Sequence, residues 1–302
     1  MTAEASPLMS GVAQESPASP RRRSSGLLRG TLRSHLGKVG LLLVLVTAGI
    51  AVIGPFATPQ DPEAIVGPPF ASPGAGYPLG TDYLGRDVLS RFLDGGSLIL
   101  VLAFLATTTG VVVGTALGLL SGYLRGVTGQ VIMRSLDVLL SFPPILLALV
   151  FMSILGAKPW LILLTVASTH VPPVARVVES ATLGLTSRGF VQYAEMIGVP
   201  RFRILTRQLL ANMVAPVMVQ FGIRMAYSIG FIGALAYLGY GRRPPAADWG
   251  SMVQENQINL ISTPLPVLAP VLALALATIG VNLLTDAFGR AAGVDLAKEG
   301  QA

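Results

Sequence analysis

The sequence predicts an all-α membrane protein with six transmembrane helices. Of its 302 residues, 52% are hydrophobic and only 12% are charged. A soluble domain usually carries about 25% charged residues, so this chain has too few charges to cover a water-facing surface. The apolar residues also form long blocks, and an α-helix needs roughly 20 such residues to cross a bilayer. These observations exclude a disordered protein, a coiled coil and most soluble enzymes.

Six apolar blocks mark the expected spans. Their bounds are Val39–Phe56, Leu98–Leu120, Val131–Leu155, Trp160–Leu183, Asn212–Leu238 and Leu265–Leu284. We therefore expect one six-span domain over residues 37–290, with a short C-terminal tail over residues 291–302. Residues 1–36 precede it as a basic tail, and its richness in Ser, Pro, Ala and Gly predicts disorder.

The distribution of basic residues predicts the orientation of the chain. If the N-terminal tail is cytoplasmic, fifteen of the 21 Lys and Arg residues lie in cytoplasmic segments and five lie outside. The remaining one, Arg224, falls inside the fifth span. This asymmetry follows the positive-inside rule and places both termini in the cytoplasm. It also accounts for the net charge of +6 without nucleic acid.

Two patterns within the spans concern helix packing. Gly110, Gly114 and Gly118 recur at four-residue spacing in the second span, which lets another helix backbone approach closely. We expect them to form a packing face, within the chain or against a second subunit. Pro143–Pro144 and Pro172–Pro173 predict kinks in the third and fourth spans.

The chain lacks the motifs of a catalytic or metal site. It has no P-loop, no Gly-x-Ser-x-Gly elbow and no cysteine. Its two histidines, His35 and His170, are far apart, and no cluster has metal-ligand spacing. We expect no enzyme activity, no metal and no cofactor on this chain. Asp137 and Asp286 lie near cytoplasmic span ends, where a structural role is favoured over a proton relay.

The segment Thr186–Leu210 is the most informative loop. Gly198 and Pro200 interrupt it, which predicts a cytoplasmic helix–break–helix that mixes apolar and basic residues. Thr186 or Ser187 is the expected N-cap. Two interpretations remain open. One is an amphipathic helix on anionic lipid, and the other is an element that docks into a groove on a cytoplasmic partner.

Arg224 is the strongest single hypothesis within the spans. An arginine deep in a transmembrane helix costs at least a few kcal/mol unless it faces water or a partner. It could line a pathway and select an anionic or carboxylate-bearing solute. It could equally pair with an acid, including one on a second subunit.

Two segments outside the membrane complete the pattern. Thr81 and Asp82 could cap a short helix that runs through Arg91, or Asp82 and Asp87 could contact an external protein. Trp160 and Trp249 are expected to lie at the membrane interface.

Four stretches of sequence together point to a known family. They are Pro78–Arg91; Gly122-Tyr123 with Met133–Asp137 and Ser141–Pro143; the Thr186–Leu210 loop; and Tyr237–Gly241 with Pro244-Pro245 and Asp248–Gly250. In these stretches the chain resembles the inner-membrane permeases of binding-protein-dependent ABC importers, in the dipeptide, oligopeptide and nickel group. The resemblance covers about residues 36–289 and implies the type I ABC importer permease architecture. In the loop, Gln192 and Tyr193 stand where the family usually has Glu and Ala, and Ala194 matches.

The resemblance implies a function and a set of partners. The chain would form half of a translocation pathway for peptides or similar small solutes in a bacterial cytoplasmic (inner) membrane. A second homologous permease, two ATP-binding subunits that hold ATP-Mg, an extracytoplasmic solute-binding protein and membrane lipid would be its partners. It would contact the ATP-binding subunits through a set of loop residues. These are Gln192, Tyr193, Ala194, Glu195, Gly198, Val199, Arg201 and Phe202.

The residues by themselves leave two other classes of function open. One is a self-contained six-helix channel or ion-coupled transporter, which would need intramembrane acids or a filter-like loop. The other is a membrane anchor for a cytoplasmic enzyme, against which the kinked spans and Arg224 argue.

Overall fold

The computed structural model describes residues 29–74 and 76–299, with side chains described through Gly293. Within these ranges the chain is helical, apart from loops and three isolated β-bridges between residues 65 and 87. Five helical segments are long and apolar enough to cross a membrane, and a bent helix pair makes up to six. The predicted fold class, an all-helical protein with up to six spans, is confirmed.

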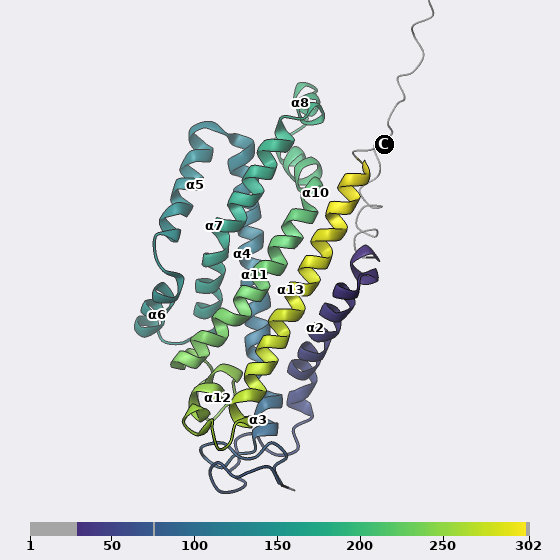
Figure 1. The fold of residues 1–302 in the computed structure, drawn as a ribbon. Helices are drawn as coiled ribbons and strands as arrows, with labels where there is room; N and C mark the ends of the chain where they lie inside the picture. The colour runs from purple at the N-terminus through teal and green to yellow at the C-terminus, as the bar shows by residue number, and fades with distance from the viewer. Residues whose placement is uncertain (1–28, 75, 300–302) are drawn as a thin grey trace, which may run out of the picture.

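Figure 1 shows the long helices side by side, with α8 and α10 at one end of the bundle and α3 and α12 at the other. The helices are α2 (His35–Ile53), α3 (Val88–Asp94), α4 (Ser97–Leu124), α5 (Gly126–Leu140), α6 (Pro144–Leu155), α7 (Pro159–Thr186), α8 (Gly189–Met196), α9 (Arg201–Arg203), α10 (Leu210–Asn212), α11 (Val214–Leu235), α12 (Trp249–Asn256) and α13 (Leu265–Glu299). Two π-helical turns, η2 (Ile204–Leu209) and η3 (Ala236–Tyr240), and two 3-10 turns, η1 (Gly54–Phe56) and η4 (Gln257–Asn259), complete them.

The third span differs from the prediction of one helix over Val131–Leu155. Instead, α5 begins at Gly126 and ends at Leu140, and α6 leaves it at an angle of 75°. Pro143 has an extended ψ of 122°, because the residue before a proline is disfavoured in the helical region. Pro172 and Pro173, by contrast, lie inside the continuous helix α7.

The first and last spans extend beyond their predicted bounds. Ser34 caps α2, and its Oγ accepts a hydrogen bond from the Gly37 N–H at 3.0 Å, so the helix begins at His35 rather than at Val39. Of the predicted N-terminal tail, residues 1–28 lie outside the described residues, and residues 29–33 are helical. At the other end, α13 continues to Glu299, past the expected end at Leu284.

Helices α4 and α7 pack closely along a row of glycines. A Cβ added at Gly114 would lie 2.8 Å from the carbonyl oxygen of Val171, and one added at Gly118 would lie 2.4 Å from that of Ala175. A Cβ added at Gly110 would lie 2.7 Å from the carbonyl oxygen of Ala167 and 2.6 Å from the His170 Cβ. The predicted packing face is therefore confirmed, and it lies within the chain.

A buried polar junction joins three spans beside this contact. The Ser228 Oγ on α11 lies 2.7 Å from the His170 Nε2 on α7 and 2.8 Å from the Thr107 Oγ1 on α4. All three side chains are fully buried. A hydrogen bond between membrane helices contributes about 0.6 kcal/mol on average, and the pair of contacts also fixes the rotation of α11.

We expect the substitution Gly118→Ala to lower the thermal stability of the purified protein. The new methyl group would collide with a backbone carbonyl, and such overpacking costs about 1–3 kcal/mol. The control is Gly230→Ala, because a Cβ at Gly230 meets no atom within 4 Å. Thermal unfolding in detergent measures both. Equal melting temperatures for the two variants would contradict the close-packing account.

Candidate functional site

The loop between α7 and α11 folds as a helix–break–helix, as predicted. Helix α8 ends at Met196, and the chain turns at Gly198, whose φ of +78° favours glycine. The predicted N-cap is wrong, since Arg188 occupies that position without a side-chain cap. Thr186 and Ser187 instead donate to carbonyl oxygens in the last turn of α7, at 3.1 and 2.9 Å.

One face of this loop is anchored to the bundle. Val191 and Ala194 are 1% and 2% exposed, and they belong to the same core cluster as Ile204 and Leu209 of η2. The Tyr123 hydroxyl, near the end of α4, donates to the Glu195 carboxylate. The loop is therefore fixed to α4 and to the segment that leads into α11. Because Ala194 faces inward, it positions the loop and offers no surface to a partner.

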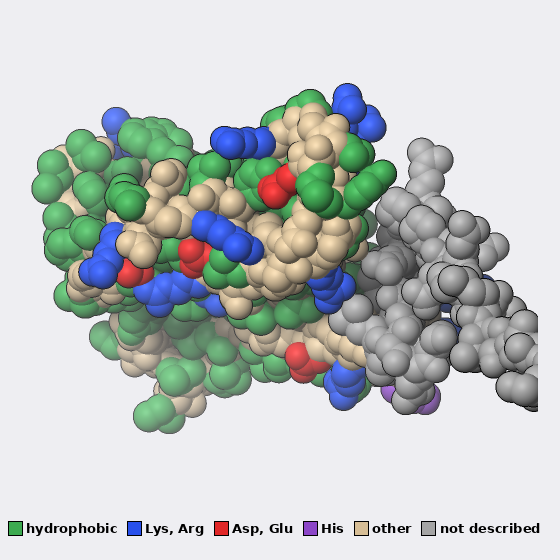
Figure 2. Space-filling view, turned by 90° about the horizontal axis from the view of Figure 1, so that it is seen from above, with side chains coloured by type: hydrophobic (Ala, Val, Ile, Leu, Met, Phe, Trp, Pro, Cys, Tyr) green, Lys and Arg blue, Asp and Glu red, His purple; other side chains and the backbone are tan. Residues whose placement is uncertain are grey.

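The opposite face of the loop exposes large apolar side chains beside basic ones. Figure 2 looks onto this end of the molecule and shows green apolar side chains among blue Lys and Arg side chains. Tyr193 is 61% exposed and Phe202 is 76% exposed. Gln192, Glu195, Gly198 and Arg201 are also exposed, and Val199 is partly buried. An exposed apolar patch with a polar rim marks an interaction site.

Sequence reasoning missed two residues of this patch. Met196 is 77% exposed and Ile197 is 60% exposed, directly before the turn at Gly198. The signal that could have identified them is the pair of large apolar residues directly before Gly198, the glycine that the sequence already predicts to break the helix. We call the exposed residues Gln192, Tyr193, Glu195, Met196, Ile197, Arg201 and Phe202 the docking face.

Arg224 lies partly buried in α11, and its Nε has no hydrogen-bond partner among the residues that the structure describes. It forms no ion pair within the described part of the chain. Tyr227, one turn away, stacks on Phe231 at 5.6 Å and meets the edge of the His170 ring at 5.6 Å. The hypothesis of a structural ion pair thus finds no acid within the described residues.

A polar row extends from Arg224 along the same helix. Gln220, four residues earlier, has a buried Oε1 with no hydrogen-bond partner in the described ranges, and Ser228, four residues later, belongs to the His170 junction. Residues four apart lie on one face of a helix. Buried polar atoms normally have partners, so the unpaired atoms of Gln220 and Arg224 indicate a place where another molecule can supply them.

At the other end of the bundle, four charged side chains form a buried cluster. The Asp82 Oδ2 lies 2.7 Å from the Arg86 Nε and 3.2 Å from the Arg91 Nε. The Glu255 Oε2 lies 3.3 and 3.0 Å from the Nη2 atoms of the same two arginines. Burial raises the pKa of Glu255, and the charges of Arg91 and Arg86 oppose that shift. The cluster fixes the segment before α3 onto α12.

The structure around this cluster corrects three expectations for the segments outside the membrane. Asp87, rather than Thr81 or Asp82, caps the helix through Arg91, because its Oδ2 accepts from the Ser90 N–H at 2.8 Å. Asp82 and Asp87 are fully buried and cannot contact another protein. Trp249 is also fully buried and donates its Nε1–H to the Phe92 carbonyl oxygen at 2.8 Å, so its side chain cannot contact lipid headgroups.

We expect Asp82→Asn to destabilise the protein strongly. The change would leave two buried arginines with one carboxylate, and breaking a buried ion pair costs about 3–5 kcal/mol. The matched control is Asp94→Asn, which breaks the ion pair with Arg242. The Asp94 and Arg242 side chains are 26% and 34% exposed, respectively. That change should cost about 1 kcal/mol or less. If both variants melt at the same temperature, the cluster does not hold the two segments together.

Within the described residues, no group of three or more His, Asp or Glu side chains could hold a metal ion.

The chain is also similar in sequence to known proteins. A family model described as the inner-membrane component of binding-protein-dependent transport systems matches residues 114–293.

Individual relatives extend this similarity over most of the chain. The chain is 34% identical over 260 residues to the glutathione transport system permease protein GsiD of Pectobacterium atrosepticum, which covers 85% of this chain and 86% of that protein. It is 32% identical over 274 residues to the dipeptide transport system permease protein DppC of Alkalihalophilus pseudofirmus, covering 90% and 89%. The GsiD protein of Shigella dysenteriae is 34% identical over 256 residues, covering 84% of each chain.

Proposed function

Because the chain belongs to the family of binding-protein-dependent inner-membrane transport components, and so is a permease subunit of an ABC importer, we propose that it forms half of a pathway for carboxylate-bearing peptides. A second homologous permease forms the other half, and an extracytoplasmic binding protein delivers the solute. Two ATP-binding subunits bind the docking face and supply ATP-Mg. The names of the relatives, which refer to glutathione and dipeptides, support the solute class.

The proposed orientation places the docking face and both termini in the cytoplasm. The excess of basic residues in these segments supports it, because Lys and Arg concentrate in cytoplasmic loops. Figure 2 shows several of those basic side chains around the docking face. The buried cluster of Asp82, Arg86, Arg91 and Glu255 then lies on the extracytoplasmic side.

The docking face is built to transmit movement of the ATP-binding subunits. Tyr193, Met196 and Phe202 offer apolar side chains to a groove, while Val191 and Ala194 hold the loop to the bundle from behind. A segment fixed in this way moves as a rigid body with α4, α7 and α11. ATP binding can favour one of two pathway orientations only through such a contact, because coupling needs different contacts in each state.

The observation that carries the solute proposal is the unpaired guanidinium of Arg224. A guanidinium can bind a carboxylate through two parallel hydrogen bonds, and this interaction is strong where water is scarce. Arg224 has a free Nε, and the Gln220 amide on the same helix face has a free oxygen. The first group suits a peptide carboxylate, and the second suits a peptide N–H.

We expect Arg224→Met to lower ATP-driven uptake sharply while the complex still assembles. Loss of one charge-assisted, bidentate contact should lower uptake about tenfold or more. Uptake of radiolabelled trialanine and glutathione into proteoliposomes measures transport, and subunit recovery measures assembly. Arg224→Lys keeps the charge and should retain part of the uptake. Loss of assembly in Arg224→Met would instead support a structural ion pair with the partner permease.

We expect the double substitution Tyr193→Ser and Phe202→Ser to release the ATP-binding subunits. Central aromatic residues of an interface contribute about 2 kcal/mol or more each, so recovery of these subunits should fall at least about tenfold. The control is Phe56→Ser, because Phe56 is 91% exposed at the opposite end of the bundle. Undiminished recovery of the ATP-binding subunits with the double variant would rule out this loop as their docking site.

A further inference from the structure

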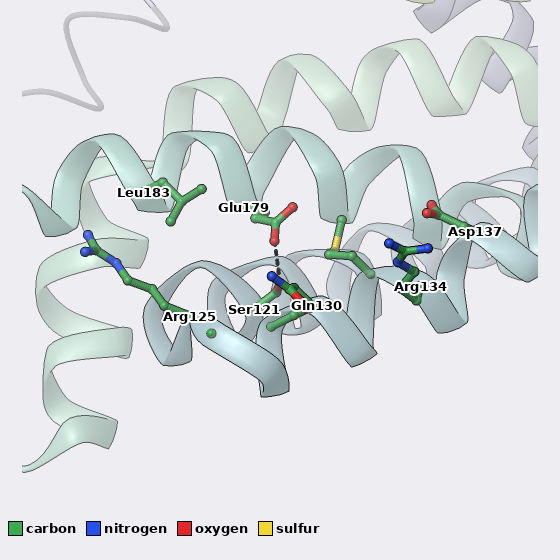
Figure 3. A pocket seen from close by; sticks show the side chains of 10 residues that line it. Ser121, Arg125, Gln130, Arg134, Asp137, Glu179 and Leu183 are labelled. Carbon is green, nitrogen blue, oxygen red and sulfur yellow. Dashed lines mark hydrogen bonds between the residues drawn. The ribbon is translucent and has the colours of Figure 1, made fainter.

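A pocket of about 550 Å³ lies between the end of α4, helix α5 and helix α7. Figure 3 shows its charged side chains along the groove between α5 and α7. Its volume is within the range of about 300–1,000 Å³ that is typical of small-molecule sites. The pocket is at the same end of the bundle as the docking face, and Arg224 does not line it.

The charges in this pocket alternate along its length. Figure 3 shows Glu179 between Arg125 at one end and Arg134 at the other. The Glu179 Oε1 lies 2.5 Å from the Ser121 Oγ, and this carboxylate forms no ion pair within the described residues. Asp137, beyond Arg134, is already paired with Arg176.

Neither arginine of the pocket has an acidic partner among the described residues either. The Arg125 side chain donates only to the Thr186 Oγ1, at 2.5 Å, and the exposed Arg134 side chain makes neither a hydrogen bond nor an ion pair in the part of the chain that the structure describes. The pocket therefore presents one unpaired carboxylate between two unpaired guanidinium groups. Glu179 disfavours a purely anionic ligand, and the arginines disfavour a purely cationic one.

We propose that this pocket binds a zwitterionic ligand. Its ammonium group lies on Glu179 and its anionic group on Arg134, with Gln130 as a further hydrogen-bonding side chain. Two sources offer this chemistry. One is a free peptide that has accumulated in the cytoplasm, an assignment that rests on the proposed function. The other is the ethanolamine headgroup of a membrane phospholipid.

Occupancy of the pocket would affect the docking face through α7. Glu179 lies about two turns before the end of this helix at Thr186, and α8 begins three residues later, at Gly189. A ligand that bridges Glu179 on α7 to Arg134 on α5 holds these two helices together. A bound peptide would then signal that transported peptide has accumulated in the cytoplasm. A bound lipid would instead stabilise the contact between α5 and α7 at all times.

Binding to the purified importer complex without ATP tests the proposal. Radiolabelled trialanine is the first probe, measured in detergent by equilibrium dialysis, and N-acetyl-trialanine amide, which lacks both charges, is tested as a competitor. Phosphatidylethanolamine is the second probe, with its retention compared with that of phosphatidylglycerol by native mass spectrometry. The variants are Glu179→Gln and Arg134→Gln. The matched controls are Asp286→Asn and Arg290→Gln, which change exposed charges on α13.

We expect one of the two probes to bind the wild type and both control variants. The same probe should bind each pocket variant about tenfold more weakly, since each pocket variant loses a charge-assisted hydrogen bond. Loss of trialanine binding assigns the pocket to peptide, and loss of phosphatidylethanolamine retention assigns it to lipid. The uncharged peptide should not compete. The proposal is overturned if neither probe binds the wild type, or if both variants bind like the controls. Because no transport is measured, failure here is distinct from failure of ATP-driven uptake by the wild type.

Discussion

The close contact between α4 and α7 is the constraint on which the other features depend. Gly114 and Gly118 bring the two backbones so near that an added methyl group would meet a carbonyl oxygen at 2.8 or 2.4 Å. In a bilayer, helices associate through such packing rather than through the hydrophobic effect. Helix α4 begins beside the buried charge cluster, and α7 ends at the docking face, so this one contact connects the two ends of the molecule.

The charged residues divide into those that the fold satisfies and those that it leaves open. Arg86 and Arg91 are buried, and each has two carboxylates and a carbonyl oxygen nearby, which makes them part of the scaffold. Arg224, Arg134 and Glu179 have no ion-pair partner in the described residues. An unpaired charge inside a membrane span, such as Arg224, is costly, which is why we propose that a solute or partner supplies its missing group.

Much of the fold could be predicted from the sequence, because bilayer thickness and glycine spacing act locally. The spans, the α4–α7 packing face and the break at Gly198 follow from such signals. The two proline pairs predict a kink in both the third and the fourth span, but they do not show that only Pro143–Pro144 breaks its helix, since the two pairs look alike in sequence. Pro172 is buried in the packed helix α7, whereas Pro143 is exposed and nothing holds a straight helix there. The buried charge cluster does not follow from such signals either, because Glu255 lies more than 150 positions along the chain from Arg86 and Arg91, with which it pairs.

The central claim is that this permease works as part of an ATP-driven complex held together at the docking face. The most direct measurement is gentle extraction of the native membrane with a C-terminally tagged chain, followed by identification of the proteins that co-purify. The account predicts a second permease and ATP-binding subunits in the purified complex. A chain that purifies alone or as a homo-oligomer would contradict it, and would favour a self-contained channel or ion-coupled transporter.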